Sequence, residues 1–147
     1  MGYPLLDEEV RIALETKAAK ARIAPVASAE DILALREAAE DVLIAVPVAR
    51  YAAQITSSTR TMKECSCGAS PRGTIALVNL ARSHALMRGR TYVLPDDIKY
   101  LAPYVLAHRV ILTHEAKING RDPKAVINSV LDSVAVPKLT EAEAKGL

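Results

Sequence analysis

The sequence predicts an all-α domain, a small helical bundle of five to seven helices with at most a minimal two-stranded β contact. Half of the 147 residues are hydrophobic, but there is no Trp or Phe and there are only five Tyr, so the core must come from small aliphatic side chains. Ala and Leu are strong helix formers. Apolar residues recur at helical spacing behind Ser, Asp and Pro start signals, which is typical of amphipathic helices.

The first third of the chain predicts two helices and the start of a third. Asp7 is expected to cap a helix that ends near Arg22. Ser28 and Asp31 resemble a capping box that opens the second helix. Its apolar positions are expected to face the core: Ile32, Leu35, Ala39, Val42 and Leu43. Pro47 suits the start of a third helix, and the short segments 25–28 and 44–47 are expected to pair as the two-stranded contact.

The middle of the chain predicts a loop over residues 61–69 and then a long fourth helix. Ser70 is a good N-cap, and Pro71 fits the first helical position because its missing N–H would be unpaired there. The helix is expected to run to about Arg88, with Gly89 as its left-handed C-terminal residue.

The last third predicts two further helices. A fifth begins at Pro95, and residues 108–112 follow as a short extended or turn segment. Asp122 and the proline after it are expected to cap and begin the last helix. We assign residues 1–138 to one domain and residues 139–147 to a flexible C-terminal tail.

The composition argues against a membrane span, a signal peptide and a structural zinc site. No apolar run approaches the roughly 20 residues that cross a membrane, and the N-terminus lacks the pattern of a signal peptide, which predicts a cytoplasmic chain. Cys65 and Cys67 could supply only two of the four ligands of a structural zinc site. They are therefore interpreted as structural or incidental thiols, and no metal site is predicted.

Charge is unevenly distributed along the chain. Residues 1–46 hold five basic and nine acidic side chains (5 − 9 = −4), whereas residues 47–112 hold nine basic and three acidic ones (9 − 3 = +6). A basic middle segment favours an anionic ligand or an acidic neighbour.

One cation in this segment stands at an unusual place. Arg72 falls in the first turn of the fourth helix, where the helix dipole is positive and Asp or Glu is normally favoured. An approaching anion would explain it, and a solvated surface arginine is the alternative. The sequence holds no phosphate-binding loop and no dinucleotide motif. We therefore expect that the chain does not bind and hydrolyse a nucleotide by itself.

Several of these stretches together resemble a known family. They are "GASPR" at 68–72, "ALVNLARSHALMRGRTYVLPDDIKYLAPYVLAHRVIL" at 76–112 and "VPKL" at 136–139, with "GYP" at 2–4 and "YAAQITSSTR" at 51–60 upstream. This pattern is similar to the C-terminal lid of the MoxR family of AAA+ ATPases, and it covers residues 2 to 138. The resemblance implies a helical bundle of the AAA+ lid type.

The resemblance also implies roles for individual residues. Arg72 would be the sensor-2 arginine that reaches the γ-phosphate of ATP, with Ser70 beside it in the nucleotide site. Tyr3 would lie near the adenine, or pack in the hinge. ATP and Mg²⁺ would be bound by the full-length parent, an ATPase whose Walker A and B segments, first sensor and arginine finger would precede residue 1. The chain alone is therefore expected not to be catalytic.

The partners implied by the family are its own AAA+ core, the neighbouring subunits of a ring (usually a hexamer) and client or von Willebrand factor A-type proteins. The function implied is chaperone-like remodelling. His84 is interpreted as a packed histidine. The pair His108 and Arg109 is interpreted as a structural element or subunit contact, with a solvated surface pair as the alternative. A stand-alone helical module that binds nucleic acid is the alternative function. Its support is three arginines near one helix end, Arg82, Arg88 and Arg90; the isoelectric point of 8.6 and the scarcity of aromatic residues argue against it.

Overall fold

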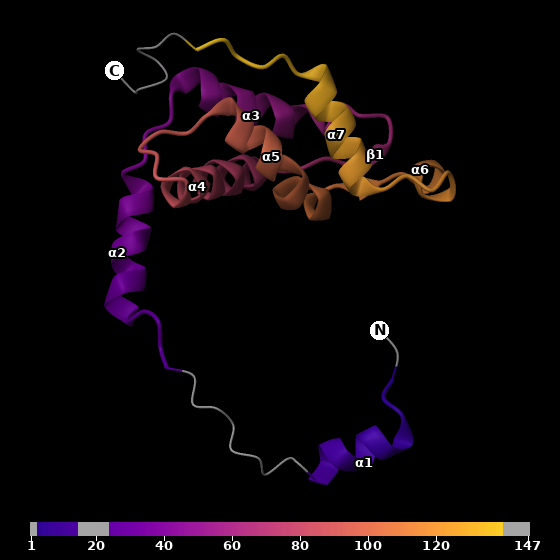
Figure 1. Cartoon of the computed structure of the whole chain (residues 1–147). Helices are drawn as coiled ribbons and strands as arrows, with labels where there is room; N and C mark the ends of the chain where they lie inside the picture. Colours follow the sequence, from indigo (N-terminus) through magenta and orange to yellow (C-terminus); the bar gives the residue numbers. More distant parts are fainter. Residues whose placement is uncertain (1–2, 15–23, 140–147) are drawn as a thin grey trace.

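The computed structural model describes residues 3–14 and 24–139 (Figure 1). Within them the chain forms seven α-helices, one short 3₁₀ helix and one two-stranded sheet, which confirms the predicted all-α class. The elements in order are α1 (Leu6–Leu14), α2 (Ala29–Glu40), α3 (Val46–Ser58), β1 (Cys65–Cys67), α4 (Pro71–Met87), α5 (Pro95–Leu106), the 3₁₀ helix η2 (Ala107–Arg109), β2 (Ile111–Leu112), α6 (His114–Ile118) and α7 (Pro123–Ser133).

The core lies between α3, α4, α5 and α7, which Figure 1 shows packed side by side. Alanine is prominent where these helices meet: Ala52, Ala81, Ala85 and Ala102 are all fully buried. Larger aliphatic side chains fill the space between them, and Tyr51 is the aromatic residue in this core. Because alanine is so small, the helix axes can approach closely at these contacts.

The first two helices lie largely outside this bundle. Figure 1 shows α2 projecting from it and α1 lying apart from it, and neither helix contains a buried residue. The expected core face of the second helix is therefore wrong for most of its length, since Ile32, Leu35 and Leu43 are exposed and only Val42 is buried. Periodicity shows that a helix has an apolar face, but it does not show what covers that face.

The predicted helix starts are confirmed in part. Ser28 Oγ accepts from the Asp31 N–H (3.1 Å) and the Asp31 carboxylate accepts from the Ser28 N–H (2.8 Å), a complete capping box. By contrast, α1 begins at Leu6, one residue before the expected cap at Asp7, and Glu8 accepts the Leu5 N–H instead (3.0 Å). The expected end of this helix near residue 22 lies outside the described residues.

The predicted β contact is wrong in its partners. Residues 65–67, expected to be loop, pair antiparallel with residues 111–112 through an irregular register. Segments 25–28 and 44–47 do not pair; instead Leu43 makes a single parallel bridge with Tyr92. The strands are only two and three residues long, so tertiary packing rather than local β propensity determines which segments meet.

The remaining boundaries agree closely with expectation. Helix α4 ends one residue earlier than predicted, and Gly89 adopts the left-handed conformation (φ +69°) expected after it. Helix α7 begins at Pro123, although the Asp122 side chain makes no capping hydrogen bond. The short helix α6 was not predicted; Thr113 caps it by accepting the Ala116 N–H (3.2 Å).

Candidate functional site

The segment before Arg72 is fixed against the end of α3 by a close backbone approach. A Cβ placed on Gly68 would lie 2.6 Å from both the Cα and the N of Arg60 and 2.7 Å from the carbonyl carbon of Thr59. These are backbone atoms, so they cannot move aside as a flexible side chain would. Gly68 is therefore the residue that lets the turn before α4 rest directly on α3.

Hydrogen bonds then hold the next residue in place. Ala69 is fully buried, and its N–H donates to Thr59 Oγ1 (2.9 Å). The Thr59 hydroxyl, itself fully buried, donates in turn to the Thr56 carbonyl oxygen (2.6 Å), while Arg60 Nε donates to the Ala69 carbonyl oxygen (2.8 Å). Both backbone polar groups of Ala69 are thus satisfied, which positions the start of α4 firmly.

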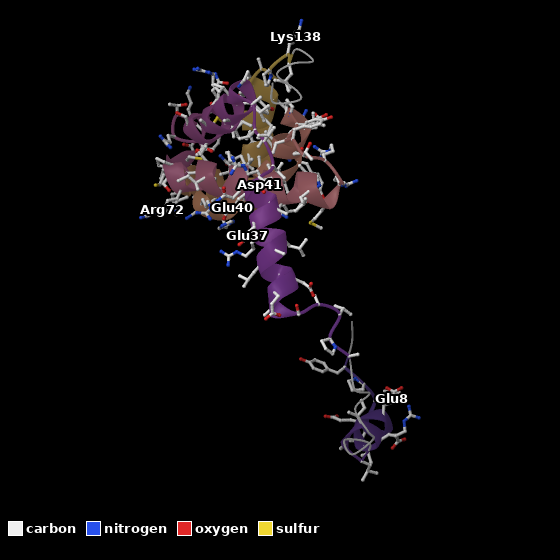
Figure 2. All side chains as sticks on the ribbon, turned by 90° about the vertical axis from the view of Figure 1, so that its left-hand side faces the viewer. Glu8, Glu37, Glu40, Asp41, Arg72 and Lys138 are labelled. Atoms are coloured by element: carbon white, nitrogen blue, oxygen red, sulfur yellow. The ribbon has the colours of Figure 1, made fainter. Side chains whose placement is uncertain are left out.

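Arg72 leaves this fixed turn and extends into solvent. Figure 2 shows its side chain at the edge of the bundle. It makes no hydrogen bond or ion pair with any of the residues that the structure describes. Ser70 occupies the N-cap position, but its hydroxyl does not accept from the helix, so the expected side-chain cap is wrong. Behind Arg72, the buried Gly73 packs closely on Leu106 of α5, where an added Cβ would lie 3.1 Å from the Leu106 Cδ2.

Two further arginines contact the same turn, here called the 68–73 turn. Arg60 does so through Ala69, and the Cδ of Arg109 lies 3.6 Å from the position of a Cβ on Gly73. Arg109 is held by a hydrogen bond from its Nε to the Val105 carbonyl oxygen (3.0 Å). Both side chains use Nε as an anchor. Together with Arg72 they place three cations at the positive end of α4, an arrangement suited to an anion.

Sequence reasoning missed Arg60 as a site residue and read Arg109 only as a structural or contact residue. The two are 49 positions apart, and no spacing rule brings them together. Arg60 lies two residues after the end of α3, and nothing local in the sequence marks it as a neighbour of the 68–73 turn.

The structure does not bring the other proposed nucleotide residue to this turn. Tyr3 is fully exposed in the segment before α1, and Figures 1 and 2 both show that segment far from the start of α4. Its predicted place near the adenine stays a prediction. Ser70 lies next to Arg72, as the sequence requires.

His84 belongs to a separate polar cluster at the other end of α4. Its Nδ1 lies 2.9 Å from Asp97 Oδ1, and its ring stacks on Tyr100 (centroids 5.4 Å apart), so it has the surroundings of a packed histidine. Arg90 holds the same carboxylate with two hydrogen bonds, 2.7 and 2.8 Å long. Burial alone would raise the pKa of Asp97, but the bonds from Arg90, the Leu94 N–H and His84 outweigh it and hold that pKa below its usual range.

The two cysteines lie on β1 as free thiols. Burial, with Glu64 and Cys67 nearby, raises the pKa of the Cys65 thiol and disfavours the reactive thiolate. Within residues 3–14 and 24–139 no three His, Cys, Asp or Glu side chains gather as metal ligands. None of the helices in that same part of the chain is long and apolar enough to cross a membrane.

The fold and the 68–73 turn together define a small helical lid-type domain. Residues 57–130, just over half of the chain, match the AAA lid domain family. The chain belongs to this family, as the lid of a MoxR-type AAA+ ATPase.

Individual relatives agree with this assignment. Uncharacterized protein YeaC of Bacillus subtilis is 37% identical over 93% of this chain and 43% of its own length. Chaperone MoxR1 of Mycobacterium tuberculosis is 32% identical over 99% of this chain and 41% of its own. A crystal structure of a protein from Cytophaga hutchinsonii assigned as an ATPase superposes with a TM-score of 0.78 at 27% identity, over 94% of this chain and 45% of that one. The chain thus spans less than half the length of these relatives.

Proposed function

We propose that Arg72 is the sensor-2 residue of the parent ATPase and couples the state of bound ATP to the position of this lid. The observation that carries the proposal is an exposed arginine without a partner among the described residues, on a turn that is fixed from both sides. A guanidinium offers forked donors that match phosphate oxygens. The unfavourable position of Arg72 at the helix start would become favourable once an anion binds.

The other residues of the turn would have supporting roles. Arg60 and Arg109 contribute positive charge near the phosphate, and Gly68 and Thr59 keep the turn in place. ATP with its Mg²⁺ supplies the γ-phosphate, whose removal by hydrolysis changes the charge that Arg72 meets. Residues outside this chain would hold the metal and the attacking water. The lid would then move between two positions as the γ-phosphate comes and goes.

At the level of the whole protein, we propose that the parent assembles as a cytoplasmic AAA+ ring and remodels client proteins in a chaperone-like manner. In this family such rings are usually hexamers. The support is the relative named Chaperone MoxR1, together with the ring assembly usual among AAA+ proteins. Von Willebrand factor A-type proteins are the partners that the family suggests.

The test is steady-state ATPase activity of the full-length parent with Arg72→Ala. Electrostatic donors at a transferring phosphoryl group supply several kcal/mol, so kcat should fall roughly 10- to 1000-fold. ADP affinity should change little because ADP has no γ-phosphate. Arg72→Lys should rescue activity only in part, since a point charge does not reproduce the fork.

A matched control is Arg88→Ala, which removes an exposed arginine at the opposite end of α4. It should leave kcat within about twofold of wild type if the effect is specific to the helix start. Intact turnover in Arg72→Ala, combined with weaker DNA binding, would instead favour the nucleic-acid module.

A further inference from the structure

An open cleft between α2 and α4 carries charged side chains that form no ion pair with any residue that the structure describes. Its volume is about 530 Å³, and its lining comprises Arg36, Ala39, Glu40, Asn79, Arg82 and Ser83. Neither guanidinium group takes part in an ion pair with another described residue. The Nε of Arg82 is buried and has no hydrogen-bond acceptor within residues 3–14 and 24–139, which costs free energy until an acceptor arrives. The lining has a net charge of +1, because it contains two arginines, Arg36 and Arg82, and one glutamate, Glu40.

Apolar side chains continue the cleft on both helices. On α2, Ile32 lies one turn before Arg36, and on α4, Ile75 lies one turn before Asn79; they are 51% and 60% exposed. Residues four apart share a helix face, so each isoleucine extends the face that lines the cleft. Leu35, also exposed, is one turn before Ala39. A ligand that matches this surface would combine apolar side chains with a carboxylate, and a free phosphate would leave the apolar part exposed.

Helix α1 has this chemistry. Leu6, Val10, Ala13 and Leu14 form one apolar stripe at helical spacing, and Glu9 lies on its margin. The helix has a net charge of −2, because it contains three acidic residues (Asp7, Glu8 and Glu9) and one basic residue (Arg11). All of its residues are exposed, and Figures 1 and 2 show it apart from the bundle. The chain therefore carries two exposed surfaces of complementary charge, both with unburied apolar side chains.

We propose that α1 of one copy of this chain docks in the α2–α4 cleft of a second copy. Glu9 meets the guanidinium groups of Arg36 and Arg82, and the two leucines and the valine of the stripe cover Ile32 and Leu35. The two sides of this contact use different residues, so it is heterologous, and such contacts generate closed rings or open filaments. The contact does not involve Arg72 or a nucleotide, so it stands or falls separately from the sensor-2 role.

The test is sedimentation velocity of the 147-residue chain over a series of concentrations without nucleotide. Wild type should associate in a concentration-dependent manner. Arg36→Glu and Glu9→Arg should each raise the dissociation constant of this association at least tenfold. Arg82→Gln should also raise this dissociation constant. Matched controls are Arg88→Glu, outside the cleft, and Glu8→Gln, which removes an acidic charge on the outward side of α1; both should associate like wild type.

Mixing the two charge-reversal variants tests the head-to-tail geometry directly. Arg36→Glu retains a normal α1 and Glu9→Arg retains a normal cleft, so the mixture should associate more tightly than either variant does alone. If Arg36→Glu loses helical signal by circular dichroism, the Glu9 variant still decides the question, because α1 lies apart from the bundle. A wild-type chain that stays monomeric at all concentrations, or association that survives both reversals, would overturn the proposal.

Discussion

Asp97→Ala is expected to be among the most destabilising single substitutions in the bundle. Asp97 is 4% exposed as a residue, and its carboxylate accepts four hydrogen bonds. Arg90 Nη1 and Nη2 donate at 2.8 and 2.7 Å, the Leu94 N–H donates at 2.8 Å, and His84 Nδ1 lies at 2.9 Å. These bonds join α4, the segment that follows it and the start of α5. Removing the carboxylate therefore frees three elements at once.

The size of the effect follows from the burial of the partners. Removing one member of a fully buried ion pair costs about 3–5 kcal/mol. The Arg90 and His84 side chains are 22% and 19% exposed, so water recovers part of that loss. We expect a loss of about 3 kcal/mol in the free energy of unfolding, and a melting temperature lower by roughly 6–12 °C for a domain of this size.

The assay is thermal and urea unfolding followed by far-UV circular dichroism, since the chain has no Trp. The adjacent Asp96 is exposed and also lies in the first turn of α5, so Asp96→Ala is the matched control and should cost less than about 1 kcal/mol. If Asp97→Ala costs no more than this control, the cluster does not stabilise the fold in the way described.

The same cluster predicts a dependence on pH. Because the folded pKa of Asp97 lies below its ordinary value of 3.8, its contribution is fully present above that value and is lost as the pH falls through the lower folded pKa. Wild type should therefore lose stability more steeply below about pH 4 than Asp97→Asn does. Parallel curves for the two proteins would show that the carboxylate is not stabilised in its charged form.

Two further substitutions test the turn and the core by the same unfolding measurement. Gly68→Ala should cost about 2–3 kcal/mol, because its Cβ would meet the Arg60 backbone at 2.6 Å; an unchanged melting temperature would mean that this turn can shift freely. Tyr51→Phe should be neutral or stabilising by up to about 1 kcal/mol, because the Tyr51 hydroxyl is buried and has no hydrogen-bond partner in the described part of the chain; a clear loss of stability would reveal a hydrogen bond to that hydroxyl.

Local signals predicted the helices of the bundle well. The prolines at positions 47, 71, 95 and 123 lie in the first turn of α3, α4, α5 and α7, as their fixed φ and missing N–H require. Gly89 was placed correctly because a left-handed residue after a helix is a local requirement. The failures concern contacts between distant segments: the pairing of 65–67 with 111–112, and the fate of the apolar face of α2.

The candidate site was predictable only in its centre. Arg72 could be found because its charge conflicts with its own helix, which is a local fact. Arg60 and Arg109 could not be identified from the sequence. They come near Arg72 only because Gly68 packs on α3 and Gly73 packs on α5. Asp97 stands in the first turn of α5, where an acidic residue is common, but its burial beneath Arg90 and His84 is a consequence of packing.

The alanine contacts between α4 and α5 have a mechanical consequence. Ala81, Ala85 and Ala102 are fully buried where these helices pack, and small side chains leave no compliant layer between the two backbones. Close packing of this kind resists sliding or rolling of one helix on the other, so we expect α4 and α5 to tilt together as one body. Helix α4 has 17 residues and is about 25 Å long, and a tilt of about 10° at the Arg72 end would therefore displace its far end by about 4 Å.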